Sequence, residues 1–485
     1  MKNEEDKIIV DEVLGDFEAL AAIPRPSLHE KAVSDYLLGV FREMGCEVVQ
    51  DASNNIIADR AATPGFENAP RVILQGHMDM VCVAAEGVKF DPLCDPIRLR
   101  RTGDELSAEG TSLGSDDGTG VAMILFVFRH AKDVGPLRAI ITTDEESGMT
   151  GAQSLDVKYL SDADYLINWD SENYDELTRG SAGSVNIGFH RKLEWEKTPE
   201  GGAWKISVRG LLGGHSGERI GDGRGNALRI LALSLCALEG KGVDFSVAAL
   251  KGGNARNAIA AESEAVIVTK AGREELQRTI FNVEKRAKII LGNADSEMQI
   301  TLSETERPLR VMSDADAAAV TEALVFLHTG VFQMSHALPN LVETSANLGM
   351  LRTEEQEAWL SYFVRSSVDE KLIEIAEVCR LLGARLGMEA KVGRPSPGWR
   401  ERPKSLLADT MAEIFEMQNG RPMKVCVIHA GLECGWHIQK APKLDMVSIG
   451  VTTRDIHSPK ETLDLTTVAP QVRLVMETLH RIAQR

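Results

Sequence analysis

Short apolar segments that alternate with helical patterns place the strongest constraint on the fold of this chain. Residues 72–74, 139–142 and 165–167 are apolar runs typical of buried strands, and residues 118–130 have a helical pattern. The alternation resumes near the end of the sequence, where residues 447–451 again read as a strand. Such alternation is typical of a sheet whose faces are covered by helices. We therefore expect an α/β fold with a layered, mostly parallel sheet.

A change in the sequence pattern after the first third of the chain predicts a second domain. Residues 179–184 are small and hinge-like, and residues 395–399, Pro-Ser-Pro-Gly-Trp, are typical of a linker. A chain of 485 residues also favours two or three domains. We expect residues 1–184 and 396–485 to form one discontinuous catalytic domain. Residues 185–395 would form an inserted α/β lid domain.

The inserted domain has the pattern of a degenerate duplication. Residues 257–269 and the helical run 274–291 resemble residues 341–366 and the helical run 370–386. Each copy would consist of a pair of strands and a helix. Two unrelated layers are the alternative.

Composition excludes several classes of protein. The formal net charge is -18, which repels a phosphate backbone, so we expect no nucleic-acid partner. The seven cysteines include no Cys-x-x-Cys pair, which argues against a disulfide framework and a thiolate zinc site. The N-terminal segment lacks the apolar core of a secretory signal, and the best apolar run, residues 121–128, is too short to span a bilayer. A cytoplasmic enzyme with no membrane partner is the simplest class.

Five polar segments lie beside the predicted strands and carry the candidate chemistry. Ligands of open α/β sheets gather at the carboxyl ends of parallel strands. Two imidazoles and several carboxylates suit two divalent cations and a water. The sequence therefore predicts metal-assisted hydrolysis at residues 76–79, 114–118, 143–146, 168–172 and 455–459.

Each segment also has a purely structural explanation. His77 can be explained as a histidine that simply ends a strand. The aspartates before residue 118 can be explained as helix caps, and the acidic residues 144–146 as a solvated turn. In the functional interpretation, Asp116 bridges two cations while Asp117 caps the helix. The occurrence of all five segments at comparable positions favours this functional interpretation.

Together the five segments resemble the signature of the co-catalytic di-zinc exopeptidases, a family that includes aminoacylases, carboxypeptidase G and carnosinase-type dipeptidases. Further segments resemble its aminoacyl-histidine dipeptidase branch, also called peptidase D or cytosolic non-specific dipeptidase. These segments are residues 144–152, 213–217, 255–259, 397–399 and 429–435. The resemblance covers nearly the whole chain.

The resemblance implies two Zn²⁺ ions per subunit, with Co²⁺ or Mn²⁺ as substitutes. His77, Asp116 and Asp170 would hold one ion. Asp116, Glu146 and His457 would hold the other, so that Asp116 bridges the pair.

The family also implies roles for residues around the metals. Asp79 would orient His77, Glu145 would be the general base, and His215 would stabilise the oxyanion of the tetrahedral intermediate. Whether His215 acts in its own subunit or across a dimer is open.

Five residues would line the substrate space. Arg365 would hold the terminal carboxylate with its fork of donors, and Glu433 would bind the free amino terminus. The others are Asn254, Arg256 and His429. For Arg365 and Arg256, surface or interdomain ion pairs are the alternative explanation.

The expected activity is hydrolysis of dipeptides, either Xaa-His, carnosine-like or of broad specificity. An N-acyl amino acid deacylase with the same two-metal site is the alternative enzyme. A non-catalytic metal or peptide binder is disfavoured, because Glu145 and every expected ligand are present. A homodimer formed through the lid is left open.

Overall fold

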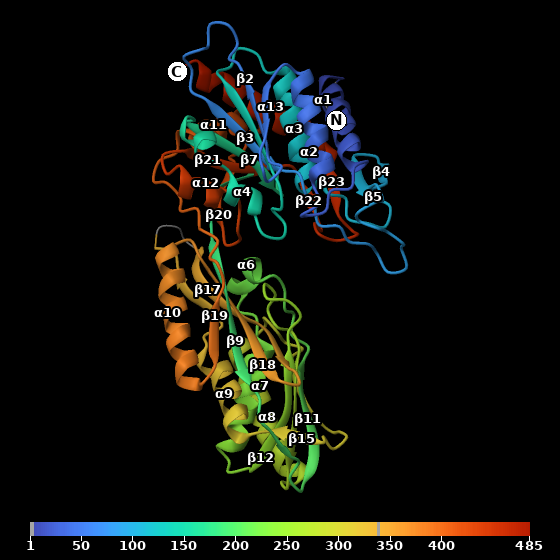
Figure 1. Cartoon of the computed structure of the whole chain (residues 1–485), viewed down its shortest axis with the longest axis vertical. Helices are drawn as coiled ribbons and strands as arrows, with labels where there is room; N and C mark the ends of the chain where they lie inside the picture. The colour runs from blue at the N-terminus through green and yellow to red at the C-terminus, as the bar shows by residue number, and fades with distance from the viewer. Residues whose placement is uncertain (1–3, 337–339) are drawn as a thin grey trace. The chain divides into compact units, whose positions relative to one another are not determined.

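The structure, a computed structural model, describes residues 4–336 and 340–485. Residues 1–3, where the expected catalytic domain begins, and residues 337–339 lie outside the described residues. The chain divides into two units (Figure 1). Unit 1 comprises Met1–Ser181, Trp399–Val427 and Leu432–Arg485, and unit 2 comprises Ala182–Gly398 and Ile428–Gly431.

Unit 1 is built on an eight-stranded sheet in the order β1-β2-β6-β3-β7-β21-β8-β20. The four strands β6, β3, β7 and β21 are parallel, whereas β1, β2 and β8 pair antiparallel with their neighbours. The carboxyl ends of the four parallel strands therefore meet at one edge of the sheet. The strands are β1 (Glu47–Gln50), β2 (Ile56–Arg60), β3 (Val72–His77), β6 (Leu137–Thr142), β7 (Tyr165–Ser171), β8 (Glu176–Ser181), β20 (Lys424–Ile428) and β21 (Asp445–Gly450).

The central strands β3, β6 and β21 of the unit 1 sheet are buried along their whole length, as expected for parallel strands covered by helices. One apolar core joins the sheet to α1 (Glu4–Ala21), α2 (Lys31–Glu43), α3 (Ser115–His130), α11 (Leu406–Asn419) and α13 (Val468–Ala483). Helix α3 is apolar all round and buried along most of its length, as expected for a helix in the centre of a domain. Beside them, α12 (Cys434–Lys440) contacts α4 (Thr150–Ser154) and α5 (Lys158–Ser161).

A small antiparallel sheet, in the order β22-β23-β5-β4, was not predicted from the sequence. It pairs residues near the end of the chain with a segment that precedes α3. The loop that contains His457 lies between its strands β22 and β23. The strands are β4 (Leu99–Thr102), β5 (Glu105–Ala108), β22 (Thr453–Arg454) and β23 (Thr462–Asp464).

Unit 2 is built on an antiparallel sheet in the order β14-β11-β13-β12-β17-β18-β9-β19, with β16 paired to β17. The strands are β9 (Gly183–Lys192), β11 (Gly202–Arg209), β12 (Phe245–Gly252), β13 (Ser263–Thr269), β14 (Gln299–Glu304), β16 (Gly330–Met334), β17 (Val342–Thr353), β18 (Glu357–Ser366) and β19 (Glu389–Val392). A separate pair is formed by β10 (Trp195–Lys197) and β15 (Arg310–Met312).

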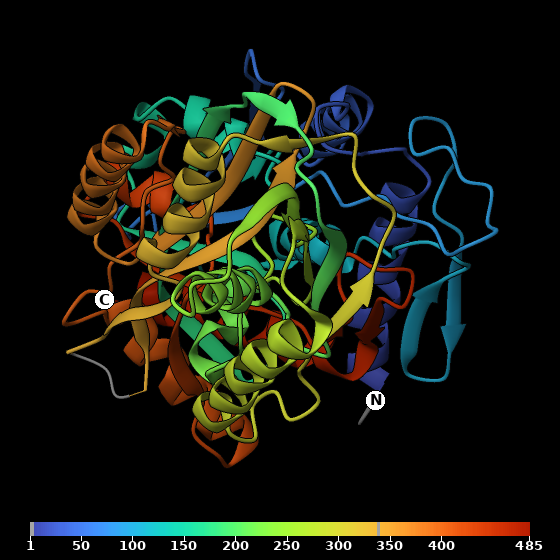
Figure 2. The same ribbon diagram turned by 90° about the horizontal axis from the view of Figure 1, so that it is seen from below.

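The two halves of this sheet share one topology. Counted along the chain, each half has its strands in the order fourth, first, third, second: β14-β11-β13-β12 and β19-β9-β18-β17. Four helices share a single core with the sheet, and Figure 2 shows them in green to brown. They are α7 (Ala227–Glu239), α8 (Arg273–Leu291), α9 (Asp314–Phe326) and α10 (Asp369–Leu386). The duplication of unit 2 stays a prediction, for which this shared order is the structural argument.

The α/β class with a mostly parallel central sheet is therefore confirmed, together with separate antiparallel sheets. None of the helices within the described ranges is both long and apolar enough to cross a bilayer.

Candidate metal centre

The five expected metal ligands lie at the edge where the parallel strands of unit 1 end. His77 is the last residue of β3, Asp170 lies near the end of β7, and Glu146 follows β6. Asp116 lies in the first turn of α3, and His457 lies in the loop between β22 and β23. Segments that are hundreds of residues apart in sequence therefore supply one site.

Asp116 lies between the two histidines. Its Oδ1 is 3.0 Å from His77 Nε2, and its Oδ2 is 3.2 Å from His457 Nε2. Asp170 Oδ1 is 3.7 Å from His77 Nε2, and Glu146 Oε1 is 2.9 Å from His457 Nε2. The structure thus forms two groups of potential ligands that share Asp116, each with its ligand atoms within 4.8 Å of one another.

These separations fit a shell of metal ligands. Ligand atoms about 2.0–2.2 Å from a tetrahedral zinc ion lie about 3.3–3.6 Å from one another. The distances of 2.9–3.7 Å found here bracket that range. The nitrogen and oxygen donors, with no thiolate among them, are those of a catalytic site for a divalent cation.

The electrostatics of the cluster also favour the binding of a cation. Burial, with a contribution from Asp170, raises the pKa of Glu145 well above its usual value. Burial, with Asp116 adding to the effect, raises the pKa of Glu146 to about 7. Burial lowers the pKa of His457, but its hydrogen bonds with Asp116 and Glu146 outweigh this and raise the pKa to about 11. The cluster therefore retains protons that a divalent cation would displace.

Asp79 organises two parts of the cluster at once. Its Oδ1 lies 3.4 Å from His77 Nδ1 and accepts a hydrogen bond of 3.0 Å from the Glu145 backbone N–H. Its Oδ2 accepts from the Glu146 backbone N–H at 3.2 Å and from the Ser27 hydroxyl at 2.8 Å. The fully buried Asp79 side chain therefore holds the turn with Glu145 through two backbone hydrogen bonds, and it lies beside the first histidine.

Asp117 does not cap α3, contrary to the sequence-based expectation. Its Oδ2 instead accepts a hydrogen bond of 3.2 Å from the backbone N–H of His77. Two glycines leave room for this carboxylate. A Cβ atom at Gly76 would lie 2.3 Å from Asp117 Oδ2, and one at Gly120 would lie 2.0 Å from Oδ1. The glycine after the second aspartate, Gly118, likewise leaves room for Arg25.

Two buried charged residues that sequence reasoning missed connect the ligand loops. Arg25 donates to the carbonyls of Met78 and Asp79 at 2.9 and 3.1 Å, and to Gly114 at 2.6 Å. Glu461 accepts from the backbone N–H groups of residues 113, 114 and 115 at 2.8, 3.1 and 2.8 Å. Arg25 thus ties the end of β3 to the start of α3, and Glu461 ties the His457 loop to the same point. The only sequence signal for Glu461 was its place four residues after His457.

Positive φ angles mark the loops of the cluster. Asp144, Asp455 and His457 have φ values of 55°, 51° and 58°. Such values are uncommon for residues other than glycine and concentrate at functional sites, where the surrounding structure holds them.

Glu433 lies in a buried polar network beneath the ligand loops. Its Oε2 accepts from Gln75 Nε2 at 2.6 Å and from Thr142 Oγ1 at 2.5 Å. Gln75 in turn accepts from Asn168 Nδ2 at 2.7 Å. Burial raises the pKa of Glu433 to about 8. These partners lie on β3, β6 and β7, two residues before His77, Asp144 and Asp170, so the network links the strands that carry the cluster.

Four of the other expected site residues gather within unit 2. Arg365 Nη2 lies 3.3 Å from His215 Nε2, and the Arg365 and Arg256 guanidinium groups both lie over the Phe363 ring, at 4.9 and 5.9 Å. Burial, with the charge of Arg256, lowers the pKa of Arg365 to about 10.

His429 belongs to the same group. Its Nε2 lies 2.7 Å from Ser345 Oγ, and burial, with the charge of Arg365, lowers its pKa to about 3. Asn254 is exposed in the loop that follows β12, and within the described residues no hydrogen bond joins it to the other four. The group is a cationic, donor-rich patch suited to a carboxylate.

Comparison with known proteins gives the family. A sequence profile described as "Peptidase family M20/M25/M40" matches residues 73–481. The chain belongs to this peptidase family. It is 32% identical to the cytosol non-specific dipeptidase of Escherichia coli (strain K12) over 469 residues, which cover 96% of each chain. The sequence-based assignments of family and enzyme class are thereby confirmed.

Solved structures extend the similarity of this M20-family peptidase. It resembles an aminoacylhistidine dipeptidase from Vibrio alginolyticus with a TM-score of 0.86 and 31% identity, over 97% of this chain and 96% of that one. It resembles a tripeptidase from Staphylococcus aureus with a TM-score of 0.59 and 16% identity, over 98% and 99% of the two chains. At that identity the second likeness shows the fold alone.

Removing the Glu461 carboxylate should loosen the metal centre of the peptidase. The Glu461→Ala variant loses the acceptor of three backbone N–H groups beside Asp116. We expect about 10–100-fold weaker binding of Zn²⁺, measured by competition with a chromogenic chelator. The control is Glu416→Ala, which removes an exposed carboxylate from α11. Equal affinities for the two variants would contradict the role of Glu461.

Proposed function

We propose that this M20-family peptidase is a metal-dependent dipeptidase. The observation that carries the proposal is that the two carboxylate oxygens of Asp116 face His77 and His457, each of which has a second acidic neighbour. The full-length likeness to proteins named as dipeptidases supports the same activity. Two divalent cations bound here, Zn²⁺ or Co²⁺ or Mn²⁺ in its place, would activate water and polarise the scissile carbonyl.

His77, Asp116 and Asp170 would hold one cation, and Asp116, Glu146 and His457 the other. Glu145 would be the general base. Its backbone N–H is bound by Asp79, which positions its carboxylate beside the cluster. Its raised pKa suits a group that takes a proton from water and passes it to the departing amine.

Unit 2 would act as a lid that recognises the substrate. Arg365 has a buried Nε without a hydrogen-bond partner among the described residues, and this donor would bind a terminal carboxylate. His215 would donate to the developing oxyanion, and Arg256, His429 and Asn254 would line the substrate space. Glu433 would bind the amino terminus from unit 1. These roles suit a short peptide with two charged ends, such as Xaa-His, a carnosine-like β-aminoacyl peptide or a broader set of dipeptides.

The cellular context is part of the same proposal. The name of the Escherichia coli relative supports a cytoplasmic location. Pairing of two copies through unit 2 stays a prediction.

Removal of metal should abolish the activity. We expect the protein to lose Ala-His hydrolysis after dialysis against EDTA and to regain it with Zn²⁺, Co²⁺ or Mn²⁺, measured by release of free histidine. Dialysis against buffer alone is the control. Full activity in a metal-free sample, checked by elemental analysis, would refute the proposal.

The Glu145→Gln variant should separate catalysis from metal binding. It keeps the shape of the side chain but cannot take a proton, so kcat for Ala-His should fall at least about 100-fold. Metal content should stay that of the unaltered protein. Glu86→Gln, at an exposed position, is the matched control. An active Glu145→Gln variant would rule out this residue as the base.

Substrate choice should distinguish a dipeptidase from an N-acyl amino acid deacylase. We expect kcat/KM for Ala-His to exceed that for N-acetyl-histidine by at least about 100-fold, because a site built for an ammonium group rejects an analogue without it. The Glu433→Gln variant should raise KM for Ala-His and leave N-acetyl-histidine unaffected. Equal rates on both substrates would favour the deacylase, and an unchanged KM would remove the amino-end role of Glu433.

A further inference from the structure

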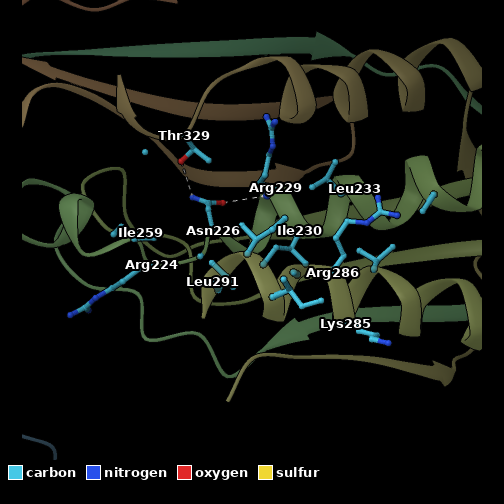
Figure 3. A pocket seen from close by; sticks show the side chains of 18 of the residues that line it. Arg224, Asn226, Arg229, Ile230, Leu233, Ile259, Lys285, Arg286, Leu291 and Thr329 are labelled. Atoms are coloured by element: carbon cyan, nitrogen blue, oxygen red, sulfur yellow. Dashed lines mark hydrogen bonds between the residues drawn. The ribbon is translucent and has the colours of Figure 1, made fainter. Parts of the chain in front are cut away.

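Unit 2 contains a large cavity that the proposed reaction does not use. Its volume is about 1140 Å³, and it is lined by α7, α8, the loop before α7 and the start of β16 (Figure 3). Pockets for small molecules in proteins measure about 300–1,000 Å³, so this cavity has room for a metabolite-sized ligand.

The charge of the cavity is opposite to that of the protein. Five cationic side chains line it: Arg224, Arg229, Lys241, Lys285 and Arg286. None of the described residues that line it is acidic, although the chain as a whole carries a net charge of -18. A concave surface with one sign of charge concentrates ligands of the opposite sign. The ligand expected here is therefore an anion.

Three of these cations have no partner of their own. Within the described residues, the exposed side chains of Lys241, Lys285 and Arg286 take part in no hydrogen bond or ion pair, and the Arg286 side chain extends from α8 towards α7 (Figure 3). The other two are held in place. Arg224 donates to the Gly213 carbonyl at 2.6 Å and forms an ion pair of 3.0 Å with Asp222, and Arg229 donates to the Leu327 carbonyl at 3.1 Å. The unbalanced positive charge of the lining therefore comes from Arg229, which is held by backbone carbonyls, and from the three unpaired side chains, whereas the charge of Arg224 is balanced by Asp222.

Most of the other lining residues are aliphatic or glycine, and Asn226, Cys236, Thr279, Asn282 and Thr329 are the exceptions. Ile230, Leu233, Ile259 and Leu291 lie around the cavity in Figure 3, and Ile290 at its rim is 74% exposed. No aromatic residue lies among the described lining residues, so the cavity offers no stacking platform for a nucleobase. These walls suit an aliphatic body attached to the anionic group.

The cavity is also connected to His215. Arg224 and Ile259 line the cavity, and both bind the glycine pair that precedes this histidine: Arg224 donates to Gly213, and the Ile259 N–H donates to the Gly214 carbonyl at 2.9 Å. Residues 215 and 258 form a β-bridge. A ligand that moves Arg224 or Ile259 would therefore move the segment that carries His215.

We propose that this cavity binds a free small organic anion with an aliphatic body, such as a medium-chain carboxylate, and that binding adjusts the position of His215. The binding step is independent of the proposed dipeptidase activity, whereas the effect on turnover rests on it.

Calorimetric titration of the full-length protein with decanoate tests the binding step. We expect saturable binding that the Arg286→Glu variant weakens at least about ten-fold, a loss of about 1.4 kcal/mol. Arg278→Glu is the matched control, because Arg278 is exposed on the same helix but does not line the cavity. Circular dichroism melting curves check that both variants fold. Absence of binding, or equal weakening by both variants, would overturn the site.

Three further measurements distinguish other occupants. Equal affinity for decyltrimethylammonium would show that the cavity selects no charge. If the protein sediments with anionic lipid vesicles and decanoate does not prevent this, the occupant is a membrane surface. If the protein self-associates and Arg286→Glu abolishes the self-association, the occupant is a second copy of the chain. Each of these results would overturn the proposal.

The effect on turnover is tested separately. If decanoate binds but kcat/KM for Ala-His stays constant, the coupling to His215 is wrong. If no dipeptide is cleaved at all, the proposed function fails while the binding result stands.

Discussion

The mutual repulsion of buried carboxylates at the carboxyl edge of β6, β3, β7 and β21 is the constraint on which unit 1 depends. Ionised carboxylates can be buried together only if nearby donors or positive charges balance them, and the protein supplies three kinds of such groups. Backbone N–H groups bind Asp79 and Asp117, the Arg25 guanidinium lies within the same shell, and imidazoles face Asp116. The negative charge that remains unbalanced makes the cluster a candidate site for cations. The same buried carboxylates thus supply both the candidate metal ligands and the negative charge that a cation would balance.

The parts of the fold that sequence reasoning predicted are those with strong local patterns. The apolar runs at 72–74 and 139–142 became the parallel strands β3 and β6, and the periodic segment 118–130 became α3. The acidic and histidine segments were recognisable because their position after such strands has a geometric meaning. The pattern thus identified one end of the sheet, where the structure brings five separate side chains together.

The parts that sequence reasoning missed depend on tertiary contacts. Arg25 and Glu461 look like ordinary surface charges in the sequence, and only the folded chain shows them buried against backbone groups. Asp117 has the sequence position of a helix cap, yet the close approach of β3 gives it a different donor. The β22–β23 sheet has strands too short for a periodic signal. In unit 2, the repeated strand order becomes visible only once the pairings are known.

The position of β21 between β7 and β8 has a consequence for how the protein is made. On the ribosome, β7 and β8 emerge first, and all of unit 2 must be synthesised before β21 can take its place between them. Until then the nascent sheet has an open apolar edge at β7, the kind of edge that pairs with foreign strands. Chaperone protection during this interval would therefore matter more for this chain than for a protein whose central strands are consecutive.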